Sequence, residues 1–286
     1  MFQRLYRLRR RFIYLAITLL AWIVIGFAID DPVFSVDNTA ATLDNPVTWA
    51  AIVLSSVIVA VGAWLFFGIF AADFRHTVEL SVLTIFLTWV VKILVPLAQG
   101  MDWLTFFAIL VVVFRLLYGP ILDARTLREM PVWSRTFRVD LSPEQVWAHM
   151  TPLPEHAESF FPPNTAIGRE EDGRLLAIYP MRDGQMYQVE RVSVQEVRAP
   201  EFFKATFEPA VMSAHSAGLS GMHTVRLEPD GDGTKVTLTE QRARTPFRRR
   251  LQWYLDDEFN DRCDSLIAFL DGRRDRSVFG MQLIRK

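Results

Sequence analysis

The sequence predicts a chain in two parts: a membrane α-helical region of four spans, and an α+β domain with an antiparallel, seven-stranded sheet and a long C-terminal helix. Four long runs before position 119 are nearly free of charge, as is typical of membrane spans. After Pro131, short alternating segments are separated by Asp-Gly pairs, which indicate hairpins. Between residues 247 and 270, apolar side chains recur at three- and four-residue steps, which favours an amphipathic helix.

The changes in composition also predict the domain boundaries. A chain of 286 residues has room for about two domains. We expect a four-span transmembrane domain at 1–119, a short linker at 120–130, the α+β domain at 131–272 and a basic C-terminal tail at 273–286. The basic residues of this tail either interact with anionic headgroups or stay in solvent. They are Arg273, Arg274, Arg276, Arg285 and Lys286.

The four apolar runs are long enough for a bilayer. Phe12 to Ile29 and Asn45 to Ala72 carry no charge, whereas Leu80 to Gly100 contains only Lys92 and Trp103 to Tyr118 contains only Arg115. A hydrocarbon core needs about 20 apolar residues in a helix. A cleaved signal peptide is the alternative for the first run, but the apolar part of a signal peptide is normally shorter.

The distribution of basic residues predicts the orientation of the spans. Five arginines precede residue 12, whereas the loop from Asp30 to Pro46 has four aspartates and no basic residue. Short loops rich in Lys and Arg stay in the cytoplasm. We therefore expect an integral, multi-pass membrane protein with both termini and the α+β domain in the cytoplasm, and the bacterial inner membrane as its location.

The α+β domain begins with a strand at 133–140 and two short helices. Ser142 is a capping residue for the first helix, Pro143 fits its first position and Gln145 completes a capping box. A second short helix is expected over Leu153 to Phe161. Turn residues then separate six further alternating segments, predicted as strands at 165–171, 174–181, 185–197, 201–208, 219–228 and 234–243.

A single long helix is expected to close the domain. Thr245 can cap it, Pro246 fits its first position and Gly272 follows its end. Its apolar stripe should cover the sheet, so the opposite face, with Asp257, Asp261 and Asp264, is expected in solvent.

This order of elements resembles the helix-grip fold. The segment HTVRLEPDGDGTKVTLTEQ (223–241), followed by a long amphipathic helix, is similar to the end of members of the START and polyketide cyclase-like (SRPBCC) superfamily. The opening SPEQVWAHMTPLPEHAESFFPPN resembles their entry helices. The resemblance covers about 131–272, and it implies a curved sheet around the helix, enclosing a cavity for a lipid, sterol, polyketide or similar apolar molecule. Some members of the superfamily are enzymes.

Strand alternation predicts which side chains point into that cavity. In their strands, His223 and Glu240 occupy alternate positions together with apolar residues, so their side chains are expected to point inward with those residues. Such a pair could fix the polar head of a ligand, act as catalytic acid and base, or satisfy only each other. In strand 185–197 the inward set is Met186, Gln188, Glu190, Val192 and Val194. The predicted ligand-binding residues are Glu190, Phe203, Phe207, His223, Val225, Leu238, Glu240, Leu255 and Phe259.

Several classes of function find no support in the sequence. The net charge of -1 argues against nucleic acid as a partner. The spacing of His149 and His156 is not that of metal ligands, and the single Cys263 excludes an internal disulfide. No phosphate-binding or nucleophile motif is present, so no metal or cofactor is predicted.

These observations predict a membrane-tethered, cytoplasm-facing binding or carrier protein for a hydrophobic ligand such as a lipid, a quinone or a polyketide-like molecule. One alternative is an enzyme of cyclase or dehydratase type, with His223 and Glu240 as acid and base. Another is an assembly or regulatory protein whose spans bind a membrane-protein partner. The expected partners are thus a hydrophobic small molecule, the bilayer and, in the last case, a membrane protein.

Overall fold

The structure is a computed structural model that describes residues 2–28, 46–69, 83–88, 90–91, 102–118, 130–180, 187–210, 220–243 and 245–282. The chain divides into two compact units. One consists of Met1–Pro120 with Tyr254–Asp256, and the other of Ile121–Trp253 with Asp257–Lys286. Each unit is described by itself.

The first unit is helical. Its helices are α1 (Phe2–Arg7), α2 (Arg9–Ala28), α4 (Pro46–Ile69) and α6 (Asp102–Tyr118), and residues 83–88 and 90–91 are also helical. Helix α2 packs against α4. Among the described residues, no helix combines the length and the hydropathy needed to cross a bilayer. The prediction of four spans therefore has no structural support.

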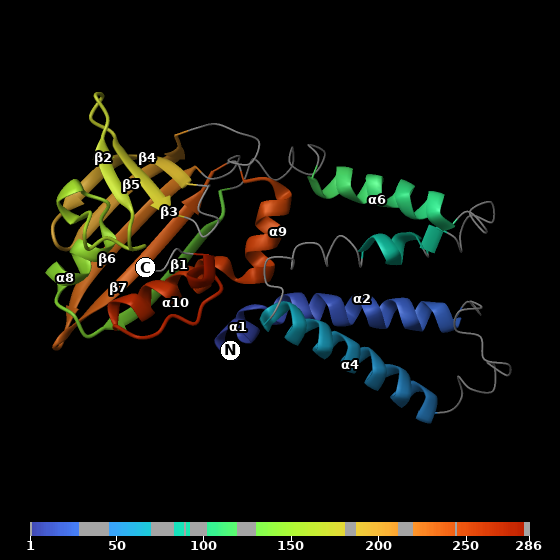
Figure 1. Ribbon diagram of the computed structural model, residues 1–286. Coiled ribbons are helices and arrows are strands. Elements are labelled where there is room, and N and C mark those ends of the chain that lie inside the picture. Colours follow the sequence, from blue (N-terminus) through green and yellow to red (C-terminus); the bar gives the residue numbers. More distant parts are fainter. Residues whose placement is uncertain are drawn as a thin grey trace. The chain divides into compact units, whose positions relative to one another are not determined.

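The second unit contains the predicted antiparallel sheet of seven strands, in the order β1-β7-β6-β5-β4-β3-β2. All six pairings are antiparallel, so the predicted sheet is confirmed. Figure 1 shows α10 lying across one face of this curved sheet. The strands are β1 (Val132–Val139), β2 (Ala166–Arg169), β3 (Leu175–Pro180), β4 (Tyr187–Arg198), β5 (Phe202–Pro209), β6 (Gly221–Asp230) and β7 (Gly233–Arg242).

Two short helical elements follow β1. Helix α8 (Pro143–Met150) starts with the predicted capping box, because the Gln145 N–H donates to Ser142 Oγ and the Ser142 N–H donates to Gln145 Oε1. The second predicted helix is wrong in extent: only Pro154–His156 forms a 3₁₀ turn, η3. Prolines on both sides restrict the backbone there to this single turn.

The predicted single C-terminal helix is also wrong, because it is broken into α9 (Phe247–Asp256) and α10 (Glu258–Leu270). Asp257 lies between them in the left-handed conformation, with a φ of 52°. Aspartate tolerates this conformation better than most residues. The apolar stripe continues across Asp257 at helical spacing, so its periodicity carries no sign of the break.

The expected solvent-facing acidic face is a further correction. Asp257 and Asp261 are buried, Asp264 is only partly exposed, and all three have polar partners. Asp264 forms an ion pair with Arg135 of β1, with 2.7 Å between Oδ1 and Nη1. Asp261 accepts the backbone N–H groups of Val278 and Phe279 at 3.1 and 2.7 Å. The acidic residues of α10 thus join this helix to the sheet and to the segment that follows it.

The C-terminal segment folds back on α10 instead of remaining in solvent. Ser277 and Val278 are buried, and residues Phe279–Gln282 form the short helix α11. Asp275 accepts hydrogen bonds from the Ser265 hydroxyl and from the Ser277 N–H. The tail prediction is therefore wrong for residues 275–280, whereas Arg285 and Lys286 lie outside the described residues.

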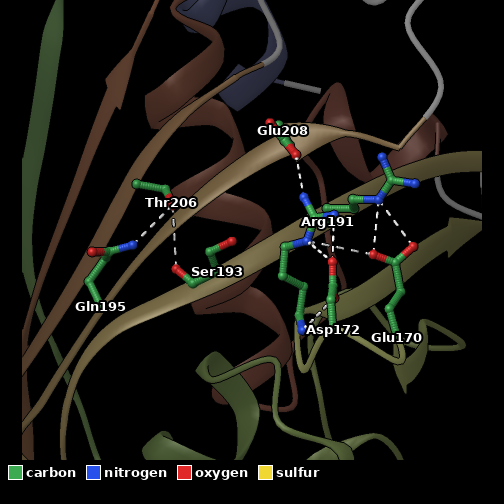
Figure 2. Close-up of polar contacts among 8 residues, drawn as sticks. Glu170, Asp172, Arg191, Ser193, Gln195, Thr206 and Glu208 are labelled. Atoms are coloured by element: carbon green, nitrogen blue, oxygen red, sulfur yellow. Dashed lines mark hydrogen bonds and ion pairs between the residues drawn. The ribbon is translucent and has the colours of Figure 1, made fainter.

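The two faces of the sheet differ in chemistry. One face packs with α8 and α10 in a single core that includes Phe203, Val225, Leu227 and Val236. The other face carries polar side chains, including the Arg191 side chain, which donates two hydrogen bonds to Glu170 at 2.9 and 3.0 Å (Figure 2). The core therefore lies between one face of the sheet and the helices.

Gly221 offers a test of how tightly β6 packs. A Cβ atom at this position would lie 2.1 Å from the Gln241 carbonyl oxygen and 2.8 Å from the Phe207 ring, whereas one at Gly168 would meet nothing. We expect Gly221→Ala to lower the free energy of unfolding by about 1–3 kcal/mol through overpacking. Gly168→Ala is the matched control and should change it by less than about 0.5 kcal/mol. Urea denaturation followed by tryptophan fluorescence measures both, and equal effects would contradict this view of the packing.

Candidate functional site

A cavity of about 190 Å³ lies between the sheet and α10. Its walls are built by α8, the segment after it, five strands and helices α10 and α11. Most of the wall is apolar, with Met150, Pro152, Phe160, Phe161, Pro162, Val192, Phe203, Ala205, Phe207, Leu238, Phe259, Leu266 and Phe279. A curved sheet that wraps one helix leaves such a space where the two diverge.

Seven polar side chains line one part of this cavity, and we call them the polar cluster. They are Tyr179, Gln188, Glu190, His223, Glu240, Arg242 and Arg262. They come from four strands and from α10. The pairing of β6 with β7 places His223 directly opposite Glu240, and the pairing of β5 with β6 places it opposite Ala205. The antiparallel register thus brings together residues that are far apart in the chain.

Glu240 lies at the centre of the cluster. One oxygen accepts a hydrogen bond from Arg242 Nε, and the other accepts one from Arg262 Nη2 at 2.6 Å. Although burial opposes ionisation, the two guanidinium groups lower the pKa of Glu240 to about 2. Glu240 is therefore a stable carboxylate at neutral pH. Arg242 also stacks on Phe207 and Trp253, with its guanidinium carbon 4.5 and 5.3 Å from the ring centres.

Glu190 has the opposite electrostatic environment. Burial is the main cause of its raised pKa, and the nearby Glu240 carboxylate contributes to it, against the attraction of Arg242. Gln188 donates a hydrogen bond to Glu190 at 2.7 Å. Burial together with the charge of Glu190 raises the pKa of Tyr179 well above its usual value, so this phenol remains protonated. The two carboxyl groups of one cavity are thus shifted in opposite directions.

His223 is a neutral imidazole at physiological pH. Burial lowers its pKa to about 4, despite the favourable charge of Glu240. The other two histidines considered in the sequence have local partners. His149 Nδ1 lies 2.6 Å from the Ser159 carbonyl oxygen, and His156 Nδ1 lies 2.8 Å from the Thr151 hydroxyl. Among the described residues, no group of three or more His, Cys, Asp or Glu side chains could hold a metal ion.

Seven of the nine predicted ligand-binding residues lie in the cavity wall. They are Glu190, Phe203, Phe207, His223, Leu238, Glu240 and Phe259. Val225 is buried in the core, and Leu255 is buried in α9, but neither lines the cavity. Of the inward set predicted for 185–197, Met186 lies outside the described residues. Val194 is 39% exposed, at the position where the register of β4 shifts.

Sequence reasoning missed two arginines. Arg242 follows Glu240 with the same strand parity, so the alternation that turned Glu240 inward also applied to it. Arg262 lies three residues after Phe259 and four before Leu266, on the same face of α10. Both signals were therefore present. Cys263 also lines the cavity, and its pKa is raised to about 12 by burial, which leaves it an unreactive thiol.

The C-terminal segment supplies one further part of the wall. Phe279 lines the cavity, and its ring centre lies 6.5 Å from that of Phe161. The ring centres of Phe161 and Phe269 of α10 lie 5.3 Å apart. The hydrogen bonds to Asp261 hold Phe279 in this position.

The seven-stranded antiparallel sheet, the long helix across it and the cavity between them define a helix-grip domain. Residues 130–266 match the model of a protein family described as "Polyketide cyclase / dehydrase and lipid transport". No curated protein matches the chain.

Several solved structures are similar to this chain. Protein NE0264 from Nitrosomonas europaea is 17% identical, and the match covers 49% of this chain and 94% of that protein, with a TM-score of 0.37. Protein MLL2253 from Mesorhizobium loti is 18% identical, and the match covers 50% of this chain and 99% of that protein, with a TM-score of 0.38. A protein from Arthrobacter aurescens is 17% identical, and the match covers 52% of this chain and 94% of that protein, also with a TM-score of 0.38.

The two carboxyl groups should respond in opposite ways to an uncharged replacement. Glu240→Gln removes the carboxylate that pairs with the buried Arg242 and the partly exposed Arg262, so the free energy of unfolding should fall by about 3–5 kcal/mol. The folded-state pKa of Glu190 is raised, so its contribution to stability is lost as the pH rises through that value. Glu190→Gln should therefore stabilise the domain at pH 8, with a gain that shrinks towards pH 4.5. Urea denaturation at both pH values measures these effects, and destabilisation by both variants at pH 8 would contradict the assignment.

His223 should make stability depend on pH. Its pKa is about 4 in the folded state against 6.5 in the unfolded state, so its contribution is present above pH 6.5 and is lost as the pH falls towards 4. About 2 kcal/mol of stability should disappear between pH 7.5 and 5 on this account. In His223→Gln this loss should be absent. The same slope in His223→Gln as in the parent protein would refute the prediction.

The C-terminal segment should detach when Asp261 loses its carboxylate. Asp261→Ala leaves the buried N–H of Val278 and the partly buried N–H of Phe279 without an acceptor, so we expect the free energy of unfolding to fall by about 2–4 kcal/mol. Limited trypsin digestion should then cut faster at Arg273, Arg274 and Arg276. Asp271→Ala, which removes an exposed ion pair with Arg273, should leave both stability and cleavage nearly unchanged. Equal cleavage in the two variants would show that Asp261 does not hold the segment.

Proposed function

We propose that the helix-grip domain binds a hydrophobic small molecule in its cavity and acts as a binding or carrier protein. The main support is the cavity itself, which is mostly apolar and has polar groups gathered in one part of its wall, as is usual for a small-molecule site. The description of the matching family includes lipid transport, which supports the same class of ligand.

The energetics of the cavity support this proposal. Protein interiors are normally packed to the density of organic crystals. In the apolar part of this space of about 190 Å³, the wall side chains lack contacts that a bound apolar molecule would supply. The same reasoning identifies Ala205, a small residue in the wall, as a position where added volume would fill the space.

Ligand binding can be tested on the purified full chain. The protein is incubated with a bacterial lipid extract and examined by native mass spectrometry, which should show a bound small molecule. Ala205→Phe should abolish the bound species, because its ring occupies the cavity. Ser193→Phe is the matched control, since it adds the same ring on the polar face of the sheet, and it should retain the ligand. Absence of any bound molecule, with a melting temperature unchanged by the extract, would refute the binding function.

We further propose that the first unit tethers this domain to a membrane, with both termini on the cytoplasmic side of a bacterial inner membrane. The support comes from the sequence: the run from Asn45 to Ala72 has no charge, and arginines are concentrated before residue 12. A domain near the bilayer would meet a membrane-derived ligand at high local concentration.

Membrane attachment is tested by fractionation. The chain should stay with the membranes after an alkaline carbonate wash, and protease should reach the domain only in inside-out vesicles. Release of the chain into the carbonate supernatant would refute the tether, without bearing on the cavity.

An enzymatic function is the second candidate, and Glu190 is the residue that favours it. Glu240 has both oxygens occupied and a pKa of about 2, which makes it a weak base. Glu190 has a raised pKa and faces the same cavity as Tyr179, so it is better suited to transfer a proton. An enzyme would convert the molecule recovered from the cavity. Glu190→Gln should then stop the conversion while the molecule stays bound; an unchanged ligand in the parent protein would argue for binding alone.

A further inference from the structure

Two arginines of the polar cluster lie in the cavity wall, and both donate to the same carboxylate, Glu240. Two guanidinium groups next to one another in this wall favour an anion over a cation as the head group of a ligand.

Arg262 is the arginine with capacity to bind such an anion. A guanidinium group carries five N–H donors, and among the described residues Arg262 donates through Nη2 to Glu240. Arg262 Nε is buried and has no hydrogen-bond partner among the described residues. The side chain is 28% exposed, and it lines the cavity. Adjacent N–H groups of a guanidinium match the two oxygens of a carboxylate, which gives a paired, charge-assisted interaction.

The size of the cavity limits the rest of the ligand. A dry cavity of about 150 Å³ accommodates one benzene molecule, and this cavity measures about 190 Å³. The apolar wall, with Phe160, Phe203 and Leu266 among its residues, offers contact to a short chain or a single ring.

We propose, on the basis of the binding function given above, that the ligand is a small amphiphile with one carboxylate head, which pairs with Arg262, and an apolar body of about one ring or a short alkyl chain. A head of this kind supplies acceptors for the donors of Arg262. An ammonium head would instead meet two arginines. An alcohol could bond to Gln188 or Tyr179 but carries no negative charge to attract the guanidinium group.

The test compares three probes with the same tail: octanoate, octan-1-ol and octylamine. Each is titrated by isothermal calorimetry into the purified full chain at pH 7.5, under one fixed buffer and detergent condition. Charge-assisted hydrogen bonds to a guanidinium distinguish octanoate from the other two probes, so it should bind at least about tenfold more tightly.

Variants of Arg262 then locate the head group. Arg262→Gln should remove the preference for octanoate while the affinity for octan-1-ol stays the same. Arg262→Lys, which keeps the charge without the planar fork, should bind octanoate with intermediate affinity. Arg191→Gln removes an arginine from the opposite face of the sheet and should bind all three probes as the parent protein does. If Arg262→Gln does not fold, the parent protein and the lysine variant still decide the question.

The outcomes separate this inference from the binding function. Equal affinity for octanoate and octan-1-ol, or an unchanged preference in Arg262→Gln or Arg262→Lys, would overturn the carboxylate head while leaving binding intact. No binding of any probe by the parent protein would overturn both.

Discussion

The carboxylate of Glu240 lies between the guanidinium groups of Arg242 and Arg262, and the arrangement of the cavity depends on this interaction. Burying one charge in an apolar interior is strongly unfavourable, so each of the three groups requires the others. Arg242 and Glu240 belong to β7, whereas Arg262 belongs to α10. The ion pairs therefore join the helix to the sheet at a place where a cavity separates their apolar surfaces.

The same interaction sets the chemistry of the neighbouring groups. With Glu240 held as an anion, a second carboxylate close by is disfavoured, which adds to the effect of burial on Glu190. His223, opposite Glu240 in the sheet, stays neutral because burial outweighs the attraction of that anion. One cavity thus contains a permanent carboxylate, a carboxyl group with a raised pKa, and a neutral imidazole. A ligand with both a polar head and an apolar body fits this distribution.

The wall of the cavity depends on contacts that are distant in sequence. Phe279 comes from beyond the end of α10, and the Asp261 carboxylate holds it by accepting its backbone N–H. Phe161, close to Phe279 in space, comes from the segment after α8. Because these residues belong to separate segments, the size of the cavity is a property of the folded domain and not of any one element.

Strand alternation was sufficient to predict the seven strands and to place His223, Glu240 and Phe203 on the inner face, because the side chains of a strand alternate with a period of two. It applied equally to Arg242, which was overlooked. Local sequence also determined the capping box of Ser142 and Gln145, which needs only residues three positions apart.

Only the tertiary structure decided the break at Asp257, the burial of Asp261, the ion pair of Asp264 with Arg135, the exposure of Val194 and the pairing of Arg262 with Glu240. The spacing of the apolar residues fits one straight helix, so it did not predict the left-handed residue between two helices. A carboxylate is withdrawn from solvent only where distant donors meet it, and these donors are Arg135 of β1 for Asp264 and the backbone beyond residue 277 for Asp261. The sequence by itself therefore determined the domain and the inward-facing groups, whereas packing between distant segments decided their partners and the space left for a ligand.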